Sequence, residues 1–245
     1  PHADLPPSDL NRPGGRLPTE STVPKNQLTI VGAFAVLATV FAVYSWVELG
    51  VEPTPAESPA PELVVIESEE THKVTPEMLA ATEKASQTTA PDFLADATDG
   101  KTYDLAELTK NGPVVLAFIK EGCPCSVASQ PYFNRLFEAY GAKVPFFGVI
   151  DGPVNRAGKW ARVNHAAFPI LCDVDLAIIH DYKAESSAYL AIVSKGGTIE
   201  KLWPGYSVEM LQDASARLAK LADMDVQPID TTGAPSGEML TGCPF

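Results

Sequence analysis

The sequence is poor in cysteine and in positive charge, and each shortage excludes a class of protein. Only four cysteines occur among 245 residues, which is too few for a small fold held together by disulfides. Their spacing also lacks the paired Cys-x-x-Cys motifs of a structural zinc site. With 18 basic against 31 acidic side chains and a net charge of −13, the chain repels phosphates, so we expect it to bind neither nucleic acid nor anionic lipid. A small set of thiols on a large core fits redox chemistry or one soft-metal site.

One long apolar run interrupts this acidic sequence. Residues 28–47 hold no charged side chain over 20 positions, enough for a helix to cross a hydrocarbon core of about 30 Å. Tyr44 and Trp46 lie near the end of the run, where amphipathic rings favour the membrane interface. Basic residues precede the run, whereas seven glutamates and no basic residue separate it from Lys73. The positive-inside rule therefore predicts a single-pass protein of a bacterial inner membrane, with a cytoplasmic N-terminus and a periplasmic main domain.

Two other interpretations of this run are weaker. A buried core helix rarely extends so far without a polar face, and a cleaved signal peptide has a shorter apolar core and a short basic leader. Here the lead-in is 27 residues long and contains three acids. A retained anchor that contacts membrane lipid through residues 28–47 is therefore favoured. Small residues that would let a partner transmembrane helix approach it are Gly32, Ala35, Ala38, Thr39 and Ala42.

Composition divides the chain into five parts. We expect a cytoplasmic tail over 1–26, a transmembrane helix over 27–49, a linker over 50–87, a folded domain over 88–222 and a C-terminal tail over 223–245. The linker begins with a proline-rich acidic spacer, which is extended and semi-rigid. It ends with Thr75 and Pro76, which predict the start of a short helix reaching about Ser86. The tail looks loose and ends in Gly-Cys-Pro-Phe.

Strand and helix patterns alternate within the folded domain. The strands expected are 114–119, 144–151, 188–193 and 198–203, and the helices expected are 153–165 and 207–221. The last two strands flank Lys195-Gly196-Gly197, which is typical of a hairpin turn. This order predicts an α/β fold with a mixed central sheet flanked by helices.

The most informative stretch follows the first of these strands. Cys123 comes directly before Pro124, and proline suits the first position of a helix. A thiol at a helix start faces free backbone N–H groups and the positive end of the helix dipole, and both favour the nucleophilic thiolate. Lys120 would add to this effect and Glu121 would oppose it.

Several landmarks in this order resemble the alkyl hydroperoxide reductase/thiol-specific antioxidant (redoxin) family of the thioredoxin superfamily. They are Ala90-Pro91-Asp92-Phe93, Asp99-Gly100-Lys101, Leu105-Ala106-Glu107-Leu108, Cys123 with Pro131 eight residues later, Phe168-Pro169-Ile170-Leu171-Cys172-Asp173 and Trp203-Pro204-Gly205-Tyr206. The resemblance covers about residues 88–222. It implies a thioredoxin-like fold and, without any cofactor, thiol–disulfide oxidoreductase or peroxiredoxin-like activity through Cys123.

The sequence also departs from the family pattern. Ser126 stands where a thioredoxin has the second cysteine of its motif, and Gly122 replaces the usual tryptophan. A peroxiredoxin would have threonine or serine at Lys120 and proline at Leu116. Ala188 takes the place of the cis-proline that faces the cysteines in the superfamily. These departures favour, as the alternative, a catalytically weak or inert accessory subunit of a larger respiratory or photosynthetic membrane complex.

Each of the other cysteines has a redox role and a simpler one. Cys125 is the first choice to resolve an oxidised Cys123, although a Cys-x-Cys disulfide closes a small strained ring; otherwise it packs as a small apolar residue. Cys172 either packs in the core or resolves Cys123. Cys243 either reaches back as a resolving thiol or stays free.

A lesser alternative is copper delivery. Cys123 and Cys125 are soft ligands that suit Cu(I), and His165 or His180 would be the third ligand. The three hypotheses make different structural predictions. An enzyme needs an accessible Cys123 with a lowered pKa, a copper site needs converging ligands, and a scaffold buries its cysteines.

Overall fold

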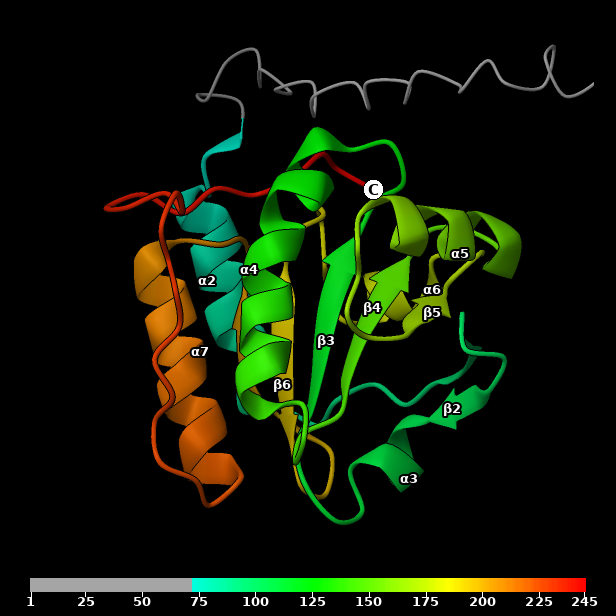
Figure 1. The fold of residues 1–245 in the computed structure, drawn as a ribbon, viewed down its shortest axis with the longest axis horizontal. Coiled ribbons are helices and arrows are strands. Elements are labelled where there is room, and N and C mark those ends of the chain that lie inside the picture. The colour runs from blue at the N-terminus through cyan, green and yellow to red at the C-terminus, as the bar shows by residue number, and fades with distance from the viewer. Residues whose placement is uncertain (1–71) are drawn as a thin grey trace, which may run out of the picture. The chain divides into compact units, whose positions relative to one another are not determined.

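The computed structural model describes residues 72–245. The expected anchor, residues 28–47, and its flanking segments lie outside the described residues. Across the described part of the chain, no helix is long and apolar enough to cross a membrane. These residues form a mixed sheet with helices on both faces (Figure 1), so the predicted α/β thioredoxin-like fold is confirmed.

The central sheet has five strands in the order β5-β4-β3-β6-β7. They are β3 (Val114–Ile119), β4 (Phe146–Ile150), β5 (Ile170–Cys172), β6 (Leu190–Ser194) and β7 (Thr198–Trp203). β3, β4 and β5 run parallel, while β6 pairs antiparallel with both β3 and β7. All six residues of β3 are buried, because helices cover both faces of the sheet, and such strands are continuous apolar runs.

Alternate residues of β3 face two different layers. Val115 and Ala117 pack in the core with α4 (Pro124–Tyr140) and α7 (Val208–Leu221), whereas Leu116 and Phe118 pack on the opposite face with α6 (Ala177–Asp181). That second face also carries β1 (Leu94–Asp96), β2 (Thr102–Asp104) and α3 (Leu105–Leu108). α5 (Val154–Val163) packs against β5. The strands and helices expected within residues 88–222 are thus present, and none of their ends differs from the expectation by more than two residues.

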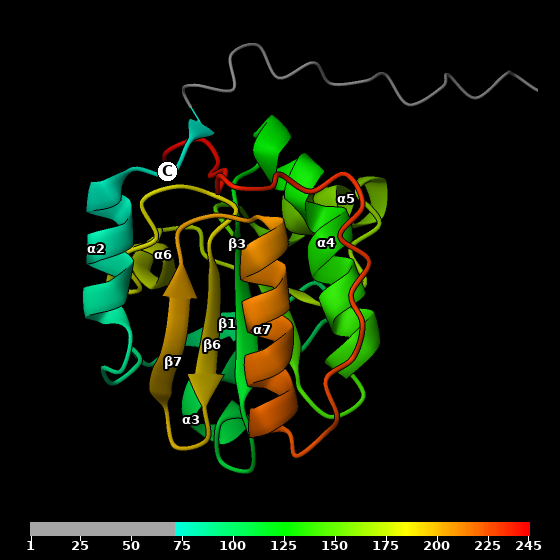
Figure 2. The same ribbon diagram turned by 90° about the vertical axis from the view of Figure 1, so that its left-hand side faces the viewer.

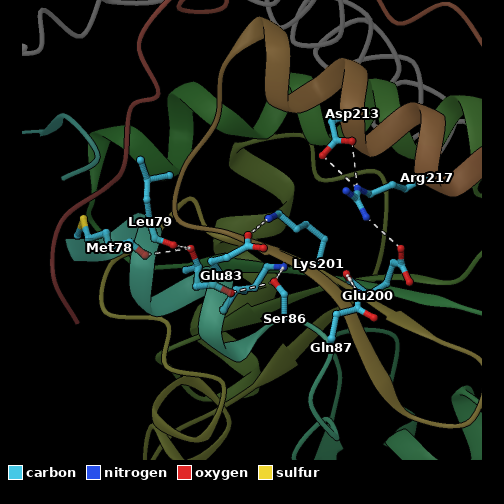
Figure 3. A network of polar contacts seen from close by, with 11 residues as sticks. Met78, Leu79, Glu83, Ser86, Gln87, Glu200, Lys201, Asp213 and Arg217 are labelled. Atoms are coloured by element: carbon cyan, nitrogen blue, oxygen red, sulfur yellow. Dashed lines mark hydrogen bonds and ion pairs between the residues drawn. The ribbon is translucent and has the colours of Figure 1, made fainter. Parts of the chain in front are cut away.

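The edge strand β7 is covered by residues 75–90, here called the α2 cover. α2 (Pro76–Ala85) starts as expected at Thr75, whose hydroxyl accepts a hydrogen bond from the Met78 amide at 3.3 Å. The buried Ser86 hydroxyl accepts a hydrogen bond from the Leu202 amide of β7 at 3.1 Å. Figure 3 shows the surrounding network, in which Lys201 pairs with Glu83. This cover protects an edge that would otherwise offer free backbone groups to another chain.

The segment 223–245 contains no helix or strand, yet it is held rather than loose. It runs back along α7 and α4 toward the end of the sheet where β3 finishes (Figure 2). The Gln227 amide donates to the Tyr140 hydroxyl at 2.9 Å. Residues 239–241 then lie between residues 72–74 and Tyr206, and the Tyr206 amide donates to the Leu240 carbonyl at 2.8 Å. We call residues 239–245 the covering segment.

Candidate active site

The turn between β3 and α4 fixes the position of Cys123. Gly122 adopts a φ of 78°, a left-handed conformation that explains why glycine stands there. The Ser126 hydroxyl accepts a hydrogen bond from the Lys120 amide at 3.0 Å, and the Asp151 carboxylate accepts one from the Glu121 amide at 2.7 Å. The thiol of Cys123 is therefore held at the carboxyl end of a buried strand, at the N-cap of α4.

Three groups from distant parts of the chain surround the Cys123 sulfur. The Cys243 sulfur lies 2.8 Å away, and the Cys243 amide donates to Cys123 Sγ at 3.2 Å. The Ser187 hydroxyl donates to the same sulfur at 3.2 Å. Because the covering segment lies over it, Cys123 is only 2 % exposed.

These contacts push the pKa values of the three clustered thiols in opposite directions. Hydrogen bonds from Cys125, then Cys243, Ser187 and the Cys243 amide, lower the pKa of Cys123 although burial opposes them. The hydrogen bond that Cys125 donates to Cys123, and then burial, raise the pKa of Cys125. Burial, and then the hydrogen bond to Cys123, raise the pKa of Cys243. These directions favour the thiolate on Cys123 and the protonated thiols on Cys125 and Cys243.

The origin of this thiolate differs from the sequence-based expectation. Cys123 does occupy the N-cap of α4, but its side chain makes no capping hydrogen bond to the helix. Lys120 does not bond to the sulfur either, because its ammonium donates to the Pro244 carbonyl. Glu121 is engaged by Arg156, with 2.5 Å between Oε2 and Nε. Thiol, hydroxyl and amide donors thus stabilise the anion in place of the groups that the sequence suggested.

Ala188, at the position expected for a cis-proline, has an unusual backbone conformation. No cis peptide bond occurs between residues 72 and 245, and Ala188 adopts a left-handed φ of 65°, which is uncommon for a residue with a Cβ. Its neighbour Ser187 points its hydroxyl at Cys123. Ser187 is the functional residue that sequence reasoning missed, and the absent proline was the signal that could have drawn attention to it.

The structure groups the four cysteines unequally. Cys123, Cys125 and Cys243 lie together, whereas Cys172 ends β5 and packs with the Ile150 cluster beside α5. Burial, then the charge of Asp96, raises the pKa of Cys172. No hydrogen bond links the Cys172 thiol to another cysteine in the described part of the chain. Of the three candidate resolving thiols, Cys243 lies with its sulfur 2.8 Å from that of Cys123, Cys125 also interacts with that sulfur, and Cys172 does not.

The copper hypothesis needed a third ligand near Cys123 and Cys125. Within residues 72–245, no group of three or more His, Cys, Asp or Glu side chains is arranged to hold a metal ion. His165 lies just after α5, and His180 lies in α6. The structure therefore adds nothing to that hypothesis.

Comparison with protein families tests the resemblance seen in the sequence. Residues 87–202 match the model of the AhpC/TSA family. This part of the chain is an AhpC/TSA redoxin domain. The match begins inside the α2 cover and ends in β7, so the redoxin domain contains Cys123, Cys125, Cys172 and Ser187. Cys243 and the rest of the covering segment lie beyond it. A search of curated proteins finds no match to this chain.

Solved structures share the fold of the redoxin domain. A putative protein disulfide isomerase from Bacteroides thetaiotaomicron is 19% identical, with a TM-score of 0.51, and the match covers 56% of this chain and 90% of that one. A conserved protein from Geobacillus kaustophilus is 20% identical, with a TM-score of 0.52 and coverage of 65% and 90%. A putative thiol:disulfide interchange protein DsbE from Chlorobium tepidum is 19% identical, with a TM-score of 0.51 and coverage of 56% and 97%. At these identities the likeness concerns the thioredoxin-like fold alone.

Proposed function

We propose that this protein is a membrane-anchored, extracytoplasmic thiol–disulfide oxidoreductase in which Cys123 is the nucleophile and Cys243 the resolving thiol. The observation that carries the proposal is the contact of 2.8 Å between the two sulfurs, with a pKa that is lowered for Cys123 and raised for Cys243. A disulfide needs a sulfur separation of about 2.05 Å, so a shift of less than an ångström brings the two sulfurs to bonding distance when a substrate disulfide oxidises them. The redoxin domain supports the same chemistry.

The exchange proceeds in two balanced steps. The Cys123 thiolate attacks one sulfur of a substrate disulfide, forms a mixed disulfide and releases the other substrate sulfur as a thiolate. Once Cys123 is no longer an anion, the hydrogen bond that raises the pKa of Cys243 is lost, and Cys243 gives its proton to the released thiolate. The Cys243 thiolate then attacks Cys123 Sγ. The second substrate sulfur is expelled as a thiolate and takes a proton from water, so the substrate leaves as a dithiol and the protein carries the Cys123–Cys243 disulfide.

Cys125 takes a different part in this scheme. Its thiol donates a hydrogen bond to the Cys123 sulfur and is the largest cause of the lowered pKa of Cys123. A bond between Cys123 and Cys125 would close a small strained ring, whereas Cys243 approaches from a separate segment. Cys125 is therefore a positioning residue that keeps Cys123 ionised.

Peroxide is the less supported substrate. Lys120 and Leu116 occupy the positions where a peroxiredoxin has a hydroxyl residue and a proline. The hydroxyl near Cys123 belongs instead to Ser187, 64 positions further along the chain. We therefore assign the disulfide, rather than the peroxide, as the substrate bond.

One observation favours the second candidate function, an inert accessory subunit of a membrane complex. Cys123 is 2 % exposed, as expected for a thiol that no substrate reaches. The same burial is consistent with an enzyme if the covering segment moves aside. The two functions therefore differ in whether Cys123 of the intact chain reacts with a disulfide.

The test uses the full-length reduced chain, a small disulfide such as cystamine, and peptide mapping by mass spectrometry. We expect a Cys123–Cys243 disulfide in the wild type, in Cys125→Ser and in Cys172→Ser. In Cys243→Ser we expect a stable mixed disulfide of cystamine on Cys123, because the resolving thiol is missing. No reaction at Cys123 in any variant would contradict the proposal and favour the accessory subunit.

The membrane anchor is part of the proposal and rests on the sequence. Residues 28–47 are uncharged and are flanked by basic residues on one side and glutamates on the other. Labelling cysteines in intact cells with a membrane-impermeant reagent tests the topology. We expect Cys243, which is partly exposed, to be labelled from outside; labelling only after the inner membrane is opened would contradict this orientation.

A further inference from the structure

The covering segment meets the redoxin domain as an added strand. Residues 242–245 run antiparallel to residues 185–187, with Ser186 opposite Pro244. The Gly242 amide donates to the Ser187 carbonyl at 2.9 Å, the Ser187 amide to the Cys243 carbonyl at 3.0 Å, and the Phe245 amide to the Glu185 carbonyl at 3.1 Å. All three bonds join backbone groups, so any extended chain of the same register can form them.

One position in this strand accepts no side chain. A Cβ placed on Gly242 would lie 1.9 Å from the Ser187 hydroxyl and 2.9 Å from the Ser187 carbonyl oxygen. The first atom is buried and occupied by its hydrogen bond to Cys123, and the second belongs to the backbone. Neither can retreat without breaking a contact of the site. Ser187 therefore excludes every residue except glycine immediately before the cysteine that meets Cys123.

The register of this strand also brings the Cys243 sulfur to Cys123. With Gly242 packed against Ser187, the next residue has its sulfur 2.8 Å from Cys123 Sγ and its amide nitrogen 3.2 Å from the same atom. The following carbonyl, that of Pro244, accepts a hydrogen bond from Lys120. The segment thus presents Gly-Cys to Cys123 in the manner of a bound substrate.

We propose that residues 242–245 occupy the docking site of the exchange partner, and that this partner is an extended polypeptide with a cysteine directly after a glycine. This inference rests on the proposed function and adds its specificity. Ser187 selects the glycine, residues 185–187 supply the backbone pairing, and the chain's own segment competes for the site until the partner displaces it.

The partner reacts by the same balanced exchange. The partner cysteine arrives in a disulfide, the Cys123 thiolate attacks its sulfur, and the former disulfide partner leaves as a thiolate that takes a proton from water. Return of the covering segment then brings Cys243 to Cys123 Sγ and releases the polypeptide as a thiol.

The experiment compares two peptides on the full-length Cys243→Ser chain. Thr-Gly-Cys-Pro-Phe and Thr-Ala-Cys-Pro-Phe are each activated as a mixed disulfide with thionitrobenzoate. The rate of coloured thiol release is measured, and the adduct is mapped to Cys123. We expect the glycine peptide to react at least about tenfold faster, since the alanine methyl overpacks a closed site.

A second pair of variants tests the competition by the chain's own segment. Adding Gly242→Ala to Cys243→Ser should undock the segment and speed the glycine peptide by about tenfold. Gly112→Ala is the matched control, because a Cβ there meets nothing within 4 Å, and it should change nothing. Circular dichroism checks that each variant is folded.

The two proposals fail in distinguishable ways. Equal rates for both peptides, with no effect of Gly242→Ala, would overturn the glycine selectivity while leaving Cys123 an active thiol. Failure of Cys123 to react with both peptides and with cystamine, even in the Gly242→Ala variant, would overturn the proposed function and this inference together.

Discussion

The α2 cover and the covering segment pack against different parts of the redoxin domain, and different interactions hold them in place. The α2 cover pairs with β7 through backbone hydrogen bonds, such as that from the Gln87 amide to the Ile199 carbonyl at 2.7 Å. It adds the buried Ser86 hydrogen bond and the ion pair between Glu83 and Lys201 (Figure 3). The covering segment also pairs through its backbone, but its remaining contacts converge on the sulfur of Cys123.

This difference separates a structural cover from a functional one. Oxidation or ionisation of a thiol changes none of the contacts between α2 and β7. The same events change the contacts of Cys243 with Cys123 directly, because they add or remove the charge that its amide and thiol stabilise. The covering segment is therefore expected to respond to the redox state of the site, and the α2 cover is not.

The largest expected effect concerns the thiolate itself. Because hydrogen bonds from Cys125, Cys243 and Ser187 lower the pKa of Cys123, the reduced chain should keep a thiolate absorbance at 240 nm well below pH 8.5, the usual range for cysteine. Cys123→Ser should abolish that absorbance completely, whereas Cys172→Ser should retain it. An absorbance that appears only near pH 8.5 would refute the ionised state.

The lowered pKa of Cys123 also determines whether the stability of the protein rises or falls with pH. The pKa of Cys123 is lower in the folded chain than in the unfolded one, so its stabilising contribution is fully present above about pH 8.5 and is lost as the pH falls through the folded value. The free energy of unfolding of the wild type, relative to Cys123→Ser, should therefore rise with pH up to that range. A difference that falls with pH would contradict the assignment.

The next effect distinguishes the two covers by amide hydrogen exchange. The Gly242 and Phe245 amides should exchange about a hundredfold faster than those of Gln87 and Ala90, since the covering segment opens locally while the α2 cover opens with the sheet. Formation of the Cys123–Cys243 disulfide should slow only the first pair. Equal protection in the reduced chain would show that the covering segment is as permanent as α2.

The sequence was sufficient for features that depend on neighbours along the chain. The buried strand β3, the cap at Thr75 and the helix start at Cys123 follow from apolar runs and from single residues of known preference, and the structure confirms all three. The family match over residues 87–202 confirms the resemblance and includes every redoxin landmark except Trp203-Pro204-Gly205-Tyr206, which follows it.

The remaining features of the site depend on contacts across the fold. Cys243 lies 120 positions from Cys123, and nothing local chooses it over Cys125 or Cys172. Ser187 matters only because the covering segment and the turn of Cys123 meet beside it. Glycine is required at position 242 because the covering segment packs against Ser187, so no local sequence pattern reveals this requirement.

A smaller effect should separate stability from reactivity. Ser86→Ala removes the acceptor of the buried Leu202 amide, which should lower the free energy of unfolding by about 1–3 kcal/mol. Thr241→Ala removes a longer bond, 3.4 Å to the Ser187 carbonyl, and should cost less. Denaturant unfolding measures both, and only Thr241→Ala should speed the reaction of Cys123 with cystamine. Faster reaction in Ser86→Ala would show that the two covers are coupled.

The smallest effect compares two exposed ion pairs, one in each region. Glu83 pairs with Lys201 in the α2 cover, and Glu238 pairs with Lys73 at 2.9 Å beside the covering segment. Both carboxylates are more than half exposed, so salt screens them strongly. Glu83→Gln should lower the unfolding midpoint slightly in dilute buffer and not at all in 1 M salt. Glu238→Gln should instead speed the reaction of Cys123 with cystamine in dilute buffer. The lost ion pair ties residues 72–74 to the covering segment, and this segment must move before cystamine reaches the thiol. Equal reaction rates for the two variants would show that the two covers do not differ in this respect.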